Sequence, residues 1–212
     1  MQKTRDDFID ALRGIAILDM ILVHYASSFP HVVTKLIVYH DVAIEGFLLL
    51  SGFVVGMHYL PLFISNRAIT SLKIFQRVIK IILIQYVMIL TASLPEFLIQ
   101  TEGVNGSMII TFLLQSFFFY NQIGLMHILP IFIPLFILTP LLLYLMSKEL
   151  DYLLLLGSVV FFILGQIDPY LINYGDKSIF PVVLWQIYFV CGCCLGKIAL
   201  KRKTCMPRNP LA

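Results

Sequence analysis

Charged residues are scarce in this chain. Asp, Glu, Lys and Arg make up 13% of its 212 residues, whereas hydrophobic residues make up 59%. A soluble globular domain is about a quarter charged, so this composition excludes an ordinary soluble fold. The net charge of +3 is also too small to indicate a protein that binds nucleic acid. Several apolar stretches reach the roughly 20 residues that a helix needs to cross a bilayer. The composition therefore predicts a polytopic membrane protein.

The four cysteines lack the spacing of a metal site. Cys191, Cys193 and Cys194 lie in one apolar stretch, and Cys205 lies in the basic tail. A C-x-C-C run within one helix cannot surround a tetrahedral ion by itself. We interpret the first three as small packing residues, and predict neither a metal site nor a bound cofactor. The sequence also lacks an internal repeat and a low-complexity tract.

Six apolar segments have about the length of a membrane-crossing helix. Basic residues precede the first segment, follow the last and cluster between the second and third, while the alternate loops carry no basic excess. The positive-inside rule therefore predicts that both termini are cytoplasmic. We expect an all-α membrane bundle, with one domain over residues 1–200 and a basic cytoplasmic tail over 201–212. The predicted spans are residues 8–29, 42–64, 74–94, 125–146, 150–168 and 179–200.

The segment 107–121 is apolar but short, and a seventh crossing there would put the basic tail outside. We therefore predict an interfacial or re-entrant helix at the outer face. A true seventh span is the alternative. Two G-x-x-x-G motifs, Gly52 with Gly56 and Gly192 with Gly196, predict close contacts between helices, because small residues let backbones approach in membranes.

The first apolar segment holds four ionisable residues, Asp10, Arg13, Asp19 and His24. Such residues are costly inside a membrane and usually face the bundle interior or a water-filled cavity. Arg13 and His24 are eleven residues apart, so they share one helix face, about 16 Å apart along its axis. Asp10 lies one turn before Arg13 and is expected to pair with it. The alternative is that Arg13 reaches the cytoplasmic interface and His24 is a hydrogen-bonded residue without a chemical role.

Two further predictions concern the second and third segments. Glu45 lies about one turn inside the second segment, near the depth expected for His24, where a carboxylate would orient the imidazole as a general base. The alternative is that Glu45 belongs to a hydrated helix start. Arg77 and Lys80, three residues apart in the third segment, could form a basic funnel for phosphate groups together with Arg13. A plain positive-inside flank is the alternative.

Four stretches resemble, in the same order, the OpgC-type proteins of the membrane-bound acyltransferase-3-like superfamily. The resemblance extends from about residue 5 to residue 197. Its first stretch is shared with many multispan acyltransferases, whereas the other three are similar to OpgC in particular. The stretches are "DALRGIAILDMILVHY", "HDVAIEGFLLLSGFVVGMHY", "MHILPIFIPLFILTPLLL" and "FPVVLWQIYFVCGCCLG".

The resemblance implies an inner-membrane O-acyltransferase. Such proteins are thought to move an acyl group, succinyl in OpgC itself, from cytoplasmic acyl-CoA to a glycan hydroxyl outside. It implies that His24 is the essential histidine and Arg13 the arginine of the first span, while Lys80 departs from the R-x-x-R type element of the superfamily. The predicted site comprises the catalytic residues His24, Glu45 and Arg13 and the substrate-binding residues Asp10, Arg77, Lys80 and Trp185.

The predicted partners are membrane lipid, acyl-CoA as the donor substrate and a glycan as the acceptor, with a homo-oligomer or a partner membrane protein left open. Similar proteins have about ten spans, so we also expect either a C-terminally truncated member or a short natural variant. Two rival functions are a transporter or flippase that uses the buried charges as a path, and an inactive family member. Inverted repeats would favour a transporter, and none is visible in the sequence.

Overall fold

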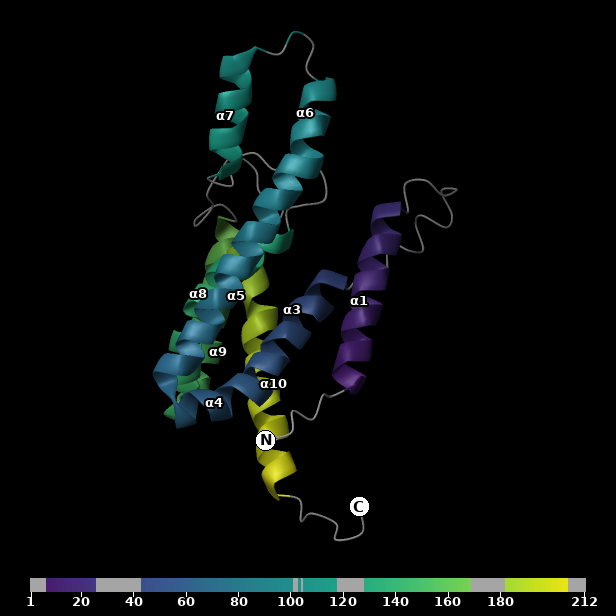
Figure 1. Ribbon diagram of the computed structural model, residues 1–212. Coiled ribbons are helices and arrows are strands. Elements are labelled where there is room, and N and C mark those ends of the chain that lie inside the picture. The colour runs from purple at the N-terminus through teal and green to yellow at the C-terminus, as the bar shows by residue number, and fades with distance from the viewer. Residues whose placement is uncertain are drawn as a thin grey trace. The chain divides into compact units, whose positions relative to one another are not determined.

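The computed structural model of the protein describes residues 7–25, 43–100, 103, 105–117, 128–168 and 182–205. Every element in these ranges is a helix (Figure 1), which confirms the predicted all-helical class. The chain divides into two compact units, one formed by Met1–Pro61 with Tyr188–Ala212 and the other by Leu62–Ile187.

Helices in the first unit come from both ends of the sequence. They are α1 (Asp7–Tyr25), α3 (Ala43–Val54), the π-helix η2 (Val55–Tyr59) and most of α10 (Val182–Cys205). The second unit holds the middle of the chain, and α4 (Leu60–Ser65) lies at the boundary. The helices of the second unit are α5 (Arg67–Met88), the π-helix η3 (Ile89–Ser93), α6 (Leu94–Gln100), α7 (Gly106–Phe117), α8 (Ile128–Ser147) and α9 (Asp151–Ile167).

Three stretches among the described helices are long and apolar enough to cross a membrane. They cover Ile44–Ser65, Arg67–Thr91 and Val182–Arg202. Shorter apolar helices cover Gly106–Gln115, Ile131–Ser147 and Asp151–Ile167. The membrane character predicted from composition is therefore supported, while three of the six predicted spans reach that length by themselves.

The helix of the third apolar segment begins before residue 74, where the predicted membrane span starts. Asn66 has an extended backbone, and its Oδ1 accepts a hydrogen bond from the backbone N–H of Ile69 at 3.0 Å. A side chain in this N-cap position satisfies one of the N–H groups that a helix start leaves without a partner. Helix α5 therefore begins at Arg67, and Arg77 and Lys80 lie three and four turns inside it.

The two G-x-x-x-G motifs form one contact, in which α3 and the adjoining η2 pack against α10. Backbone atoms occupy the space that a side chain would need at each glycine: the carbonyl oxygen of Phe189 at Gly52, that of Cys193 at Gly56, that of Leu49 at Gly192 and that of Phe53 at Gly196. Later residues of α3 meet later residues of α10, so the two helices run parallel. The close contacts predicted from these motifs are confirmed, and their geometry is the one in which Cα–H groups lie against carbonyl oxygens.

Helices α5 and α8 run side by side and antiparallel in the second unit (Figure 1). The guanidinium of Arg67 lies 5.3 Å from the centre of the Tyr144 ring, whereas Phe75 lines a groove with Phe136. Rising numbers on α5 therefore meet falling numbers on α8. Ile74 and Val78 of α5 are buried, as are several residues along one side of α8.

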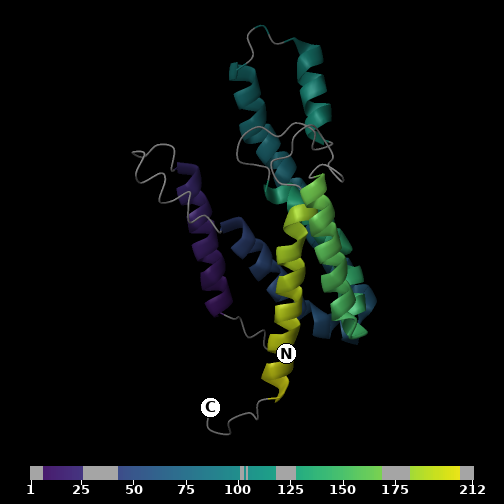
Figure 2. The same cartoon turned by 180° about the vertical axis from the view of Figure 1, so that it is seen from behind.

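The first turns of α10 pack antiparallel to α9 (Figure 2). Gly165 faces Val183 and Leu184, whereas Ser158, two turns earlier, hydrogen-bonds to Gln186. The Ser158 hydroxyl donates to Gln186 Oε1 at 2.8 Å, and Gln186 Nε2 donates to the Ser158 carbonyl oxygen at 2.8 Å. These two hydrogen bonds join the helices inside otherwise apolar sequence.

Helices α6 and α7 form a hairpin (Figure 2). The rings of Phe97 and Phe112 stack at a centroid distance of 4.4 Å, and Phe112 is buried. Helix α7 covers Gly106–Phe117, which is most of the short segment predicted to lie at the interface; residues 118–121 of that segment lie outside the described residues. Twelve helical residues extend about 18 Å, less than the roughly 30 Å of a bilayer core.

Candidate functional site

Two of the predicted site residues in the first unit, Asp10 and Arg13, form an ion pair on α1. Arg13 Nη1 lies 3.9 Å from Asp10 Oδ1, three residues earlier. The two side chains are 30% and 39% exposed respectively, so the pair is only partly withdrawn from its surroundings. The contact predicted from their spacing is thus confirmed. It leaves a guanidinium, with its fork of donors, near the N-terminal end of the helix.

His24 lies eleven residues beyond Arg13 on the same helix. Helix α1 is unbroken from Asp7 to Tyr25, so both backbone positions keep the common face that the 3.6-residue period requires. The side chain of His24 lies outside the described residues. Glu45 lies in the first turn of α3, where it is half-buried. The contact between His24 and Glu45 therefore stays a prediction.

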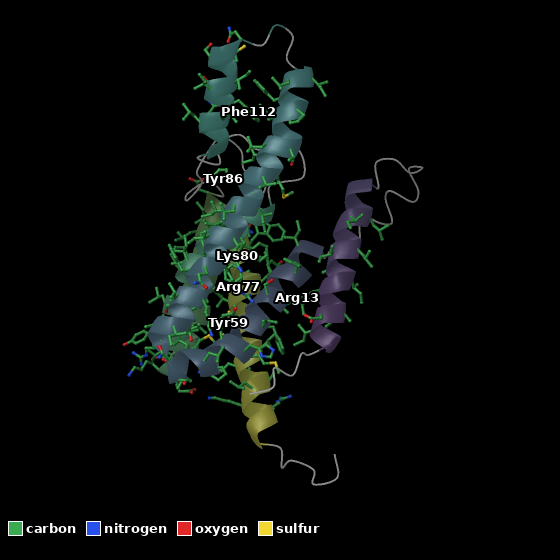
Figure 3. All side chains as sticks on the ribbon, viewed as in Figure 1. Arg13, Tyr59, Arg77, Lys80, Tyr86 and Phe112 are labelled. Carbon is green, nitrogen blue, oxygen red and sulfur yellow. The ribbon has the colours of Figure 1, made fainter. Side chains whose placement is uncertain are left out.

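The predicted cations Arg77 and Lys80 of the second unit share one stripe of α5 with Lys73. Lys73, Arg77 and Lys80 are spaced by four and three residues, which places them on one side of the helix. All three side chains are exposed, and Figure 3 shows Arg77 and Lys80 on the same stretch of α5. We call these three residues the basic stripe. Its predicted union with Arg13 in one funnel stays a prediction, because Arg13 belongs to the other unit.

The basic stripe reaches deep into a helix that has the length and hydropathy of a span. Arg77 is ten residues and Lys80 thirteen residues beyond Arg67, or about 15 Å and 20 Å along the axis. The candidate span covers Arg67–Thr91, and a bilayer core is about 30 Å thick. Charges at such depth face a bundle interior or a water-filled cavity rather than lipid. Because the three side chains are exposed in the structure, the polar path along α5 and the simple flank at the membrane surface both stay predictions.

Three cysteines of α10 are packing residues. Cys193 and Cys194 are buried, Cys191 is half-buried, and the carbonyl of Cys193 lies against Gly56. Within the described ranges, no group of three or more His, Cys, Asp or Glu side chains gathers as metal ligands would.

A comparison with known protein families identifies the family of this chain. A family model described as OpgC protein matches residues 5–212. The chain belongs to the OpgC family. The resemblance found in the four sequence stretches is thereby confirmed over nearly the full chain. Neither the curated proteins nor the solved structures contain a match to this OpgC-family chain.

The fourth OpgC-like stretch contains Gln186, whose hydrogen bonds to Ser158 were not predicted from the sequence. Trp185 is half-buried near the start of α10, and its neighbour Gln186 is the residue that hydrogen-bonds to Ser158 of α9. A serine and a glutamine in apolar segments were the available signal, because such residues in membrane helices bond across to neighbouring helices. The bonded pair restrains the turn of α10 that carries Trp185.

Proposed function

We propose that this OpgC-family protein is an integral-membrane O-acyltransferase of the cytoplasmic membrane. It moves an acyl group from cytoplasmic acyl-CoA to the hydroxyl of a glycan on the other side of the membrane. The family resemblance favours succinyl as this acyl group. Family membership over residues 5–212 supports a glucan-modifying, acyltransferase-like role. The acyl group and the acceptor belong to the proposal.

The observation that carries the proposal is the continuity of α1. An unbroken helix holds Arg13, paired with Asp10, and His24 on one face about 16 Å apart. In the proposed reaction the guanidinium of Arg13 binds a phosphate group of acyl-CoA, and the basic stripe is a separate candidate for phosphate binding. Charge-assisted, forked hydrogen bonds suit such groups. The thioester then extends along the α1 face toward the imidazole.

The proposed chemistry requires one base and one carbonyl. The His24 imidazole takes the proton of a glycan hydroxyl, whose oxygen forms a bond to the thioester carbonyl carbon. The bond from carbon to sulfur breaks, and the leaving CoA thiolate takes the proton back from the imidazolium. Glu45, in the first turn of α3, is the proposed partner that orients the imidazole. No bound cofactor enters these steps.

The test is an acyl-transfer assay with the full chain in vesicles. Radiolabelled succinyl-CoA is supplied outside the vesicles, on the cytoplasmic face of the protein, and purified glucan is enclosed inside them. The label is then measured in the glucan, free inside the vesicle and free outside it. Label in the glucan supports the proposal. Free label inside the vesicle, with none in glucan, indicates a transporter, and label that stays outside and unreacted indicates an inactive protein. Vesicles without the protein provide the background.

The directions of the packed helices support a chain that crosses the membrane six times. In this topology α7 does not cross the membrane. A chain reverses direction at each crossing, so the parallel contact of α3 with α10 requires an odd number of crossings between them. Helices α5, α8 and α9 supply three, and a crossing by α7 would make four. Independently, the antiparallel contact of α5 with α8 fits consecutive crossings with no complete span between them.

This topology predicts which introduced cysteines react from outside the cell. We expect a membrane-impermeant maleimide to label Asn105→Cys, before α7, and Asp168→Cys, after α9, but not Lys148→Cys, between α8 and α9. If α7 crosses the membrane, Asn105→Cys and Lys148→Cys will instead react alike, because an even number of crossings would separate them. The unsubstituted chain, with Cys205 in its tail, is the control, and permeabilised cells show that every site can react.

A further inference from the structure

A groove lies between α5 and α8 on the flank opposite the basic stripe. It is open to the surroundings, has a volume of about 390 Å³ and is lined by Ala68, Ser71, Leu72, Ile74, Phe75, Phe136, Ile137 and Pro140. Phe75 and Arg77 are two residues apart, which is about 160° around a helix. The basic stripe and this groove therefore lie on different sides of α5, and the proposed function leaves the groove without a role.

The groove is apolar because of which residues line it. Seven of its eight lining residues are hydrocarbon or proline, and Ser71 is the polar exception. Small side chains at Ala68 and Ser71 leave the space, buried Ile74 and Phe136 form its floor, and the exposed rings and branches of Leu72, Phe75 and Ile137 form its rim. It occupies the first two turns of the candidate span Arg67–Thr91, within one leaflet of a bilayer.

A restrained cation lies at the end of this groove. The guanidinium of Arg67 lies 6.0 Å from the Phe63 ring centre and 5.3 Å from that of Tyr144. Arg67 precedes Ala68 and is one turn before Ser71, so it lies where the groove meets the end of the span. Its side chain is exposed, and within the part of the chain that the structure describes no carboxylate pairs with it. Two rings therefore orient a fork of donors toward the surroundings.

We propose that this groove is a binding site for one membrane phospholipid. An acyl chain lies in the groove along Leu72, Phe75 and Ile137, and the lipid phosphate accepts hydrogen bonds from the Arg67 guanidinium. The apolar lining matches the chain, and the position of Arg67 at the end of the span matches the depth of a headgroup. The site is separate from acyl transfer, so the two proposals succeed or fail independently.

The charges around Arg67 favour a single phosphate over a polyanion such as acyl-CoA. Lys148 follows α8 one turn beyond Tyr144 and is exposed, but Glu149 and Asp151 follow directly. This end of the helix pair is therefore mixed in sign, unlike the basic stripe, which has three cations and no carboxylate on its side of α5. A phospholipid headgroup carries one phosphate and suits the mixed environment.

The experiment measures lipid binding to the purified full chain. The protein in detergent is titrated with dioleoyl phosphatidylglycerol or dioleoyl phosphatidylethanolamine, and bound lipid is counted by native mass spectrometry. We expect one lipid to bind more tightly than the rest. Arg67→Gln should weaken this binding about tenfold or more, because the charge-assisted hydrogen bonds to the phosphate are lost. Arg67→Lys should weaken it less, and Ser71→Leu, which fills the groove, should remove the tight lipid.

Lys73→Gln is the matched control, because it removes an exposed cation from the same helix on the opposite flank. It should leave the tight lipid in place. Equal elution profiles and unfolding temperatures establish that each variant is folded. The proposal is overturned if all variants bind lipid like the unsubstituted chain, if Lys73→Gln loses as much as Arg67→Gln, or if glycerol phosphate competes as well as the intact lipid. A photoactivatable acyl chain that crosslinks away from α5 and α8 would also overturn it.

Discussion

Replacing Gly192 with valine is expected to remove almost all folded protein. The carbonyl oxygen of Leu49 already occupies the space of a side chain at this position, and the obstructing atoms are backbone. No rotamer change can make room, so α3 and α10 must separate and lose the contacts at Gly52, Gly56 and Gly196. Overpacking in cores costs about 1–3 kcal/mol where side chains can adjust. Here we expect a cost above that range, against a total stability of about 5–15 kcal/mol.

The measurement is the amount of monodisperse protein recovered from membranes, and we expect it to fall at least about tenfold. Each loss of about 1.4 kcal/mol in the free energy of unfolding lowers the ratio of folded to unfolded protein tenfold, and native proteins are only marginally stable. Gly157→Val is the matched control on α9, because nothing lies within 4 Å of a side chain added there. It should accumulate normally, since a glycine inside a helix is itself unfavourable by up to about 1 kcal/mol. Similar recovery of the two variants would contradict the α3–α10 contact.

Alanine at His24 is expected to lower the rate of acyl transfer by at least about 10²-fold without changing the amount of protein in the membrane. The residue lies near the C-terminal end of α1, where alanine is the best helix former. Loss of a general base typically lowers the rate about 10²–10⁴-fold. The rate of label transfer to glucan should fall within this range, while protein recovery and unfolding temperature stay constant.

His58→Ala separates this effect from the loss of any histidine. His58 lies in the π-helix η2, in the same unit as His24 but on a different helix. We expect the His58→Ala variant to keep transferring acyl groups. Full activity of His24→Ala would refute the assignment of His24 as the base. If both variants lose activity to the same extent, the histidines of this unit affect the folded structure rather than proton transfer.

Residue spacing was sufficient to predict several local features. The three-residue interval predicted the Asp10–Arg13 pair, because the contact depends only on helix geometry. The G-x-x-x-G spacing likewise predicted that α3 and α10 would be contact helices, since only small residues allow backbones to touch. The start of α5 was not predicted, because the span was assigned from hydropathy, which rises at residue 74, whereas the Asn66 cap, a local hydrogen bond, sets the helix start at Arg67.

Other features depended on partners that spacing cannot identify. Gln186 and Ser158 are 28 residues apart, and nothing local in either segment indicates that they would bond to each other. Arg67 belongs to the basic cluster between the second and third apolar segments, and its guanidinium lies against Tyr144, a ring 77 residues later in the chain. Such contacts arise from the register of two packed helices, and many registers are compatible with the same apolar sequence.

The sequence by itself determined that this chain is helical, apolar and a member of the OpgC family, because composition, helix period and motif order are properties of consecutive residues. The tertiary structure decided which helices run together: α3 parallel to α10, and α5 antiparallel to α8. Direction of packing is set by the fit of side chains and backbones between segments far apart in sequence. That fit is also what creates the groove beside Arg67, which no single segment contains.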